Sequence, residues 1–205
     1  MDVSLGEAVA AVHASVVQVL PGDSGGAGVV LSRAGELVVV TNAHVARGLP
    51  GQRVQVASHG RRLYSAIIEQ TDRRRDLALL GLRLHGAADP GEFTPATLGD
   101  TTALRPGQLL LAIGHPFGLA HAVTAGVVQA VGPLRDAWAS RLPSRDLSWV
   151  QADIMLAPGN SGGPLLDIEG RVVGINTMVV GGLALAVPVP DIRALLQGRS
   201  EAIPA

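Results

Sequence analysis

The chain has 205 residues, 47% of them apolar, with 26 glycines, 13 prolines and a formal net charge of −1. This length and composition predict one globular domain (residues 1–205) with a substantial core made of many short strands and turns. The near-neutral charge argues against a nucleic-acid partner, and the absence of cysteine excludes disulfides and thiolate metal sites.

The N-terminal segment carries no recognisable export signal. Residues 8–20 are apolar, but no basic segment precedes them and no clear cleavage site follows. No apolar stretch in the sequence reaches the length that crosses a bilayer. We therefore expect no integral membrane segment, and the localisation stays open.

A first pair of chemical candidates follows a β-branched run. Residues 38–40 (VVV) predict a buried strand, and His44 falls at its end. Further along, Asp76 opens a second apolar strand at residues 76–80 (DLALL). Because a carboxylate at the edge of a core is costly to bury unless it is paired, His44 is a natural partner for Asp76.

A glycine-rich segment supplies the third candidate. Residues 158–164 (PGNSGGP) place Ser161 between glycines, which let a backbone turn sharply and approach a ligand closely. Such a turn can direct backbone N–H groups at one point beside the serine hydroxyl, as an acyl-transfer enzyme needs to hold a tetrahedral oxyanion. The alternative interpretation is an ordinary surface turn.

The three candidates together form a possible catalytic triad. A serine is a weak nucleophile unless a base lies beside it and a third group orients that base. The chain order His44, Asp76, Ser161 is the order of the chymotrypsin arrangement. Ser24, in residues 22–26 (GDSGG), precedes every plausible base, so it is interpreted as part of a glycine-rich turn.

Other readings of the polar residues fit less well. An α/β-hydrolase elbow at Ser161 requires a later histidine, and none follows His121. Asp72 competes with Asp76, but it lies beside residues 73–75 (RRR) and is expected to be a solvated loop charge. His115 competes with His44 as the base, but its Gly-His-Pro turn favours a structural role. The remaining histidines are expected at the surface: His13, His59, His85 and His121.

The sequence resembles the HtrA (DegP/DegS-type) serine proteases in three motifs: residues 41–45 (TNAHV), 76–80 (DLALL) and 159–164 (GNSGGP). Weaker matches extend the resemblance from about residue 9 to residue 196. It implies an all-β, chymotrypsin-like fold of two six-stranded antiparallel β-barrels with a short C-terminal helix. The implied bounds are about 9–88 for the first barrel, about 96–190 for the second and 191–197 for the helix, with a connector at 86–91.

The resemblance implies a serine endopeptidase that acts on unfolded or misfolded polypeptides, without a cofactor or a metal ion. The alternative is a catalytically silent peptide-binding module on the same fold. The oxyanion would be held in the turn of Gly159, Asn160 and Ser161, by the N–H groups of the first and last of these. Because Asn160 stands where trypsin-type zymogens carry an aspartate, we expect no activation by N-terminal cleavage.

The resemblance also implies a primary specificity pocket, formed by Met155, Leu156, Ala157, Leu183, Ala184 and Leu185. No charge lies in this set, so we expect small or medium aliphatic P1 side chains, with the substrate added as a strand beside residues 183–185. Family members are usually extracytoplasmic, form trimers through N-terminal residues and often continue into a PDZ domain. We expect here a protease domain without a PDZ domain, for which a homotrimer is one candidate assembly.

Overall fold

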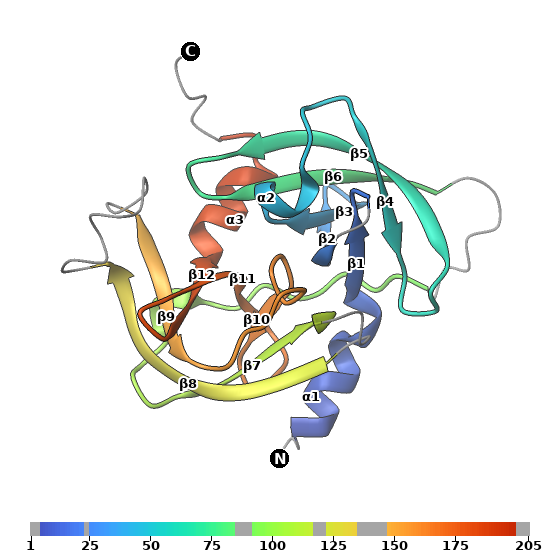
Figure 1. Cartoon of the computed structure of the whole chain (residues 1–205). Helices are drawn as coiled ribbons and strands as arrows, with labels where there is room; N and C mark the ends of the chain where they lie inside the picture. Colours follow the sequence, from blue (N-terminus) through green and yellow to red (C-terminus); the bar gives the residue numbers. More distant parts are fainter. Residues whose placement is uncertain (1–4, 23–24, 85–91, 117–121, 135–146, 200–205) are drawn as a thin grey trace.

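The computed structural model describes residues 5–22, 25–84, 92–116, 122–134 and 147–199. Its strands form two closed antiparallel barrels of six strands each, and a short helix follows the last strand (Figure 1). The predicted all-β fold with two six-stranded barrels and a short C-terminal helix is therefore confirmed. The predicted connector at 86–91, together with Ser24, His85 and His121, lies outside the described residues.

The first barrel has the strand order β1-β2-β3-β6-β5-β4. Its strands are β1 (Val16–Leu20), β2 (Gly26–Arg33), β3 (Glu36–Thr41), β4 (Arg53–Ala57), β5 (Leu63–Asp72) and β6 (Leu77–Arg83). β2 and β3 are joined through Ala34 and Gly35, which both have positive φ (51° and 86°). Two positive φ values in a two-residue loop are those of a type I′ turn, whose twist suits an antiparallel hairpin.

The second barrel has the strand order β10-β11-β12-β9-β8-β7. Its strands are β7 (Leu109–Gly114), β8 (Ala122–Pro133), β9 (Ser148–Asp153), β10 (Pro164–Leu166), β11 (Val172–Val180) and β12 (Leu183–Pro188). β10 pairs with β7 and so closes the barrel.

Alternation along the strands explains why the apolar runs are continuous. In β3, Val39 belongs to the interior of the first barrel, whereas Val38 and Val40 belong to a core that lies between the barrels. Leu111 and Ile113 of β7 reach the same shared core from the second barrel. Both faces of such strands are buried, so the β-branched run that predicted a strand has no polar face.

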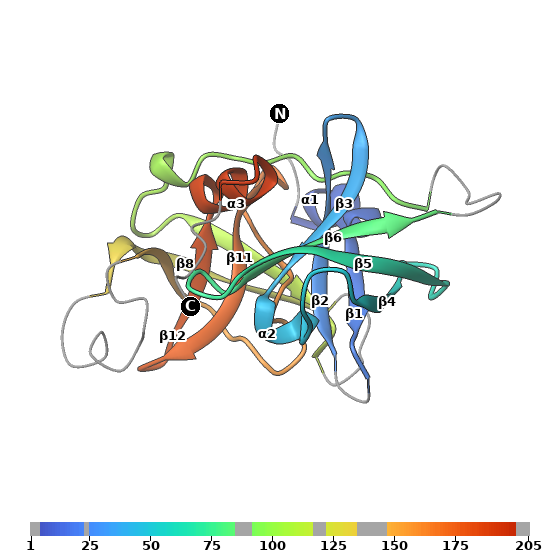
Figure 2. The same ribbon diagram turned by 90° about the horizontal axis from the view of Figure 1, so that it is seen from above.

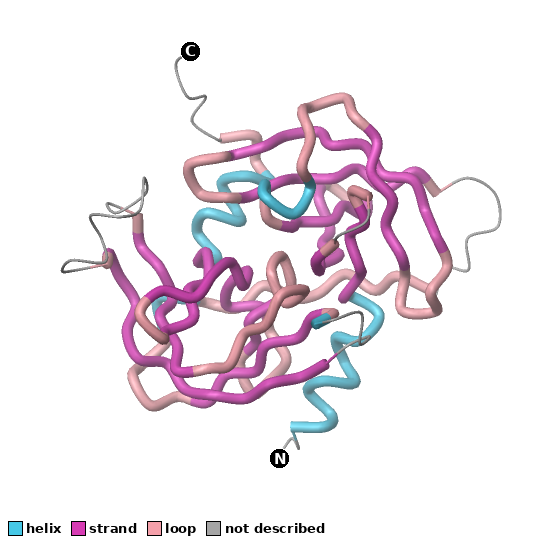
Figure 3. The backbone as a smooth tube through the Cα atoms, viewed as in Figure 1, coloured by secondary structure: helices cyan, strands magenta, loops and turns pink. Residues whose placement is uncertain are grey.

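Short helices lie at the ends of the strands. They are α1 (Leu5–Val12), η1 (His13–Ser15), α2 (Ala43–Ala46), η2 (Thr101–Ala103) and α3 (Val189–Leu196). α3 buries Val189, Ile192 and Leu195 in the shared core and contacts β6 of the first barrel as well as β11 and β12 of the second (Figure 2). Figure 3 shows α2 and α3 where the two barrels meet. The C-terminal helix is thus part of the junction between the barrels.

The described ranges contain neither a metal-binding cluster nor a membrane-spanning helix. No three His, Asp or Glu side chains within them are grouped so as to share a metal ion. None of the helices there has both the length and the apolar character needed to cross a bilayer.

Candidate active site

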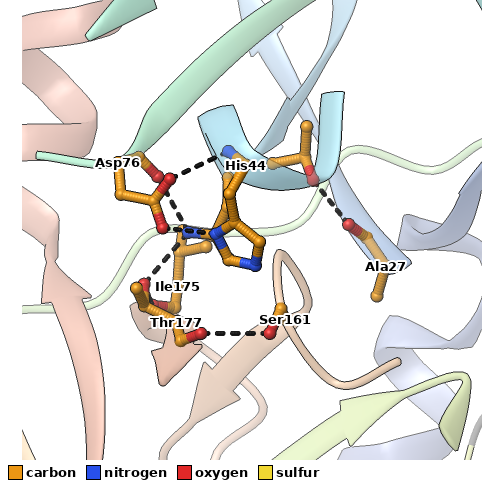
Figure 4. Close-up of polar contacts among 8 residues, drawn as sticks. Ala27, His44, Asp76, Ser161, Ile175 and Thr177 are labelled. Carbon is orange, nitrogen blue, oxygen red and sulfur yellow. Dashed lines mark hydrogen bonds and ion pairs between the residues drawn. The ribbon is translucent and has the colours of Figure 1, made fainter. Parts of the chain in front are cut away.

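His44 and Asp76 form a direct pair at the junction of the barrels. β3 ends at Thr41 and Asn42 caps α2, so His44 lies on a one-turn helix and not at the end of the strand, as the sequence had suggested. His44 Nδ1 lies 2.6 Å from Asp76 Oδ2, and the His44 backbone N–H donates to Asp76 Oδ1 at 2.9 Å (Figure 4). Asp76 Oδ2 therefore holds the imidazole with Nε2 turned away from Asp76, while Oδ1 holds the backbone of His44.

The backbone of Asp76 is held in a strained conformation. Its φ of 54° is left-handed, which costs a residue with a side chain about 1–2 kcal/mol. Its carbonyl oxygen accepts the backbone N–H of Ala43 at 3.2 Å and the side-chain amide of Asn42 at 2.9 Å. Asn42 also donates to Thr177 Oγ1 at 3.0 Å, so this buried amide links the acid to β11 of the second barrel.

Ser161 lies in the turn between β9 and β10 and faces the same cleft as His44 (Figure 4). Its Oγ donates to the backbone carbonyl of Thr177 at 3.0 Å. In the described part of the chain, no hydrogen bond joins Ser161 Oγ to the imidazole. A rotation about the Cα–Cβ bond of the serine changes the direction of its hydroxyl, and nucleophile–base contacts are often looser without substrate.

The backbone beside the serine forms a tight turn. The Asn160 N–H donates to the Ala157 carbonyl at 3.0 Å, so Pro158 and Gly159 are the central residues of a β-turn. Gly159 has a φ of 106°, and a positive φ at this place is the signature of a type II turn. Toward other described residues, the N–H groups of Gly159 and Ser161 make no hydrogen bond. Asn160 uses its own N–H within the turn, so it is not a free donor.

A cleft of about 420 Å³ runs between the two barrels at this point. The first barrel contributes Gly25, His44, Val45 and Arg47. The wall from the second barrel is mainly apolar and includes Leu156, Ala157, Pro158, Met178 and Val179.

The predicted specificity pocket is only partly present in this cleft. Leu156 and Ala157 line it, whereas Met155 is 77% exposed and lies outside the lining. Residues 183–185 belong to β12, which pairs with β11 along one edge and with β9 along the other. Because both edges are occupied, a substrate strand cannot add there, and that prediction is wrong.

β11 offers the edge that β12 lacks. Its pairing with β10 ends at Ile175, while its pairing with β12 continues to Val180. Residues 177–180 therefore have one edge without a strand partner among the described residues. Thr177, Met178 and Val179 line the cleft, so this free edge faces Ser161.

The trypsin-like peptidase domain family matches residues 26–175, which is more than half of the chain and includes all three triad residues. The chain belongs to this family. Similar curated proteins include "Serine protease HTRA2, mitochondrial" of Drosophila pseudoobscura pseudoobscura (35% identical) and of Drosophila persimilis (36%). Each match extends over 179 residues and covers 87% of this chain but 40% of the relative, so the chain spans less than half the length of these proteins.

Solved structures give the same assignment. The HtrA-type protease AlgW with a tripeptide has a TM-score of 0.79 and 28% identity, covering 96% of this chain and 65% of that one. AlgW with a decapeptide has a TM-score of 0.78 and 26% identity, covering 96% and 67%. Over nearly its whole length, this trypsin-like peptidase domain is thus similar to HtrA-type proteases.

In this trypsin-like domain, His115 supports the turn beside the serine. Its backbone N–H donates to the Gly159 carbonyl at 3.0 Å, and the residue is 6% exposed. Burial, with a smaller contribution from nearby His13, lowers the pKa of His115 from 6.5 to about 4. The side chain is therefore neutral at pH 7, and its position suits the structural role expected for it.

Asp72 is not the solvated loop charge that the sequence suggested. It is 3% exposed, and its Oδ2 lies 3.0 Å from Arg75 Nη1. The prediction failed because the arginine run suggested solvent, whereas Arg74 and Arg75 are half-buried and only Arg73 of this run is exposed. The strand β5 extends to Asp72, and Arg75 links this carboxylate to Asp191 of α3.

Two polar residues of the site were not singled out from the sequence. Asn42 and Thr177 are both buried. The Asn42 amide donates to Thr177 Oγ1, and this hydrogen bond joins the two barrels behind the triad. Each was visible only as part of a motif, in residues 41–45 and in residues 174–177 (GINT). Their contact spans 135 positions of the chain, so no local pattern could have paired them.

Proposed function

We propose that this protease domain hydrolyses peptide bonds through His44, Asp76 and Ser161. The observation that carries the proposal is the 2.6 Å contact between His44 Nδ1 and Asp76 Oδ2, with Ser161 in the same cleft. A carboxylate in this position fixes the imidazole tautomer and stabilises its charged form, which is what the base of a serine protease requires.

In the proposed reaction, Ser161 Oγ attacks the carbonyl carbon of the scissile peptide while His44 Nε2 takes the hydroxyl proton. The negative oxygen of the tetrahedral intermediate accepts hydrogen bonds from the N–H groups of Gly159 and Ser161. His44 then gives its proton to the leaving amine, and an acyl-enzyme remains. Water, deprotonated by His44, attacks that ester and releases the new carboxyl terminus.

The substrate main chain is proposed to pair with the free edge of β11 at residues 177–180. Added strands gain main-chain hydrogen bonds that do not depend on sequence, so the substrate must be extended. Unfolded or misfolded polypeptides supply such segments. The similar HtrA-type protease AlgW has been solved with a tripeptide and with a decapeptide, which supports peptide ligands for a protein of this type.

The apolar wall of the cleft supports small or medium aliphatic P1 residues. Leu156, Ala157 and Met178 offer no carboxylate there, so a basic P1 side chain would be buried without an ionic partner. Burial of an aliphatic side chain in the cleft is favourable, because it removes apolar surface from water.

The second candidate is a silent peptide-binding domain on the same fold. One observation favours it: Ser161 Oγ donates to the Thr177 carbonyl and makes no hydrogen bond with His44 in the described residues. The presence of all three triad side chains in one cleft favours the enzyme.

A fluorophosphonate probe distinguishes the two candidates. The enzyme is expected to gain one adduct by intact mass, and Ser161→Ala is expected to gain none. An unlabelled wild-type protein, with a native thermal unfolding transition, would support the silent domain instead. Loss of a triad member typically costs about 10⁴–10⁶ in rate, so residual labelling cannot mimic activity.

A further inference from the structure

Arg75, the residue before Asp76, bridges two carboxylates that belong to different parts of the fold. Its Nη1 lies 3.0 Å from Asp72 Oδ2, and its backbone N–H donates to Asp72 Oδ1 at 2.9 Å. On the other side, its Nε donates to Asp191 Oδ1 at 3.0 Å. Asp72 ends β5 of the first barrel, whereas Asp191 lies in the first turn of α3, after the second barrel.

The bridge is largely shielded from water. The side chain of Asp72 is 3% exposed, that of Arg75 17% and that of Asp191 21%. Burial alone would lower the pKa of Arg75, but its hydrogen bonds to Asp72 and Asp191 outweigh burial and raise it. Burial raises the pKa of Asp191, and the contact with Arg75 opposes that rise. Removing one partner of a shielded ion pair leaves the other charge without compensation, which is costly.

The position of Arg75 matters because Asp76 is strained. A left-handed φ of 54° in a residue with a side chain persists only where its surroundings determine it from several directions. The segment after β3 holds its carbonyl oxygen through Asn42 and Ala43, and its carboxylate through His44. On the N-terminal side, Arg75 directly precedes Asp76. Asp72 holds the backbone N–H of Arg75, and Asp72 and Asp191 together hold its side chain.

We propose that Arg75 and Asp191 are positioning residues for the triad: they tie α3 to the turn that presents Asp76 and keep its carboxylate aligned with His44. This rests on the proposed function of the triad. Neither residue touches the reacting atoms, so each acts through Asp76. Because α3 packs in the core between the barrels, the tie couples the alignment of Asp76 to the docking of the barrels.

The variant Asp191→Ala tests the tie most directly, because it leaves the Arg75–Asp72 pair intact. We expect kcat to fall about 10- to 100-fold with KM nearly unchanged, the loss typical of a small misplacement. The far-downfield ¹H NMR signal of the proton between His44 Nδ1 and Asp76 Oδ2 should weaken or shift. Asp191→Glu, which keeps the charge, should recover most of kcat. Arg193→Ala, an exposed change on the same helix, is the matched control and should alter neither quantity.

The outcomes separate positioning from mere stability. If Asp191→Ala lowers the unfolding temperature but leaves kcat within twofold of wild type and the NMR signal in place, the proposal is overturned. If this variant does not fold, Asp191→Asn replaces it with the same readouts. The NMR signal also keeps the proposal testable in an inactive protein: wild type that resists the fluorophosphonate probe defeats the proposed function, and the signal still reports whether Asp191 aligns Asp76.

Discussion

The backbone N–H of Ala27 donates to the carbonyl oxygen of Ser161 at 2.8 Å, which fastens the nucleophile of the second barrel to β2 of the first. The Ala27 carbonyl in turn accepts Thr41 Oγ1 at 2.7 Å (Figure 4). Gly162 fits against this contact, and its N–H donates to the Asn176 carbonyl at 2.8 Å. The serine is therefore positioned by backbone contacts from both barrels.

Gly162→Ala should disrupt this junction. A Cβ added there would lie 2.1 Å from the Ala27 carbonyl oxygen and 2.2 Å from Thr41 Oγ1, both too close for any contact. Gly162 also has a φ of 85°, which adds a backbone cost. We expect the free energy of unfolding to fall by about 2–5 kcal/mol, the sum of left-handed strain and overpacking, and probe labelling to slow at least 10-fold.

Gly107→Ala is the matched control for this change. Gly107 has the same φ of 85°, but an added Cβ meets no atom within 4 Å. It should therefore cost only the left-handed strain, about 1–2 kcal/mol, with normal labelling. Urea unfolding and labelling rates measure both variants. If Gly162→Ala and Gly107→Ala lost the same free energy of unfolding, the close approach to Ala27 would not contribute to the effect.

Asn42→Ala should weaken the alignment of Asp76. The Asn42 amide donates to the Asp76 carbonyl and to Thr177 Oγ1, and the residue is fully buried. Removing it takes the donor from buried Thr177 Oγ1, leaves the Asp76 carbonyl with the Ala43 N–H alone and opens a small cavity, so stability should fall by about 1–3 kcal/mol. We expect kcat to fall with it. Thr177→Val removes only one of the two hydrogen bonds of the Asn42 amide, so it should lower stability and kcat less than Asn42→Ala does. Urea unfolding measures the stability, and peptide hydrolysis measures kcat. A larger effect of Thr177→Val would contradict the role given to Asn42.

The fold could be predicted from the sequence because both faces of its strands are buried. Continuous apolar runs such as residues 38–40 and 76–80 mark strands that lie between a barrel interior and a second core. The triad could be predicted because each member lies beside a motif with its own turn chemistry. The exact end of β3 could not, since the α2 turn is stabilised by Asp76, which lies 32 residues after His44.

Two of the failed predictions concern residues whose surroundings come from distant segments. Asp72 looked solvated next to three arginines, but it is buried, and Arg75 links it to Asp191 of α3. Residues 183–185 had an apolar pattern that suits a substrate-binding strand, but pairing with β9 occupies their second edge. The burial of Asp72 and the pairing of residues 183–185 depend on helix docking and strand order, and no local sequence pattern indicates either of these.

The cleft chemistry predicts a sharp difference between P1 residues. In matched peptides, cleavage after Val, Ala, Ile or Leu should exceed cleavage after Arg or Lys by at least about 100-fold in kcat/KM, because an unpaired buried cation costs several kcal/mol. Ala157→Asp, which adds a carboxylate to the apolar wall, should narrow this difference. Mass spectrometry of a digested peptide library measures the preference. A library cut mainly after Arg or Lys would contradict the assignment of this wall as the P1 pocket.

The stability of the domain should fall on acidification because His115 is buried in its neutral form. Burial and His13 hold its pKa at about 4 in the folded state, below the value of 6.5 in an unfolded chain. As the pH falls below 6.5, the unfolded chain binds a proton that the folded protein does not, so stability is lost. The loss continues until about pH 4, where the folded protein also binds the proton, and reaches about 3 kcal/mol.

His115→Asn removes this proton uptake and keeps a polar side chain in the Gly-His-Pro turn. The variant is expected to lose some stability at pH 7, because a packed imidazole is replaced by a smaller group. Between pH 7 and pH 4.5, however, its free energy of unfolding should fall less than that of wild type, by about 2–3 kcal/mol. Urea unfolding of wild type and of His115→Asn, each at pH 7 and at pH 4.5, measures these free energies of unfolding. Parallel losses in the two proteins would mean that His115 titrates normally in the folded state and that carboxylates or His13 cause the acid sensitivity.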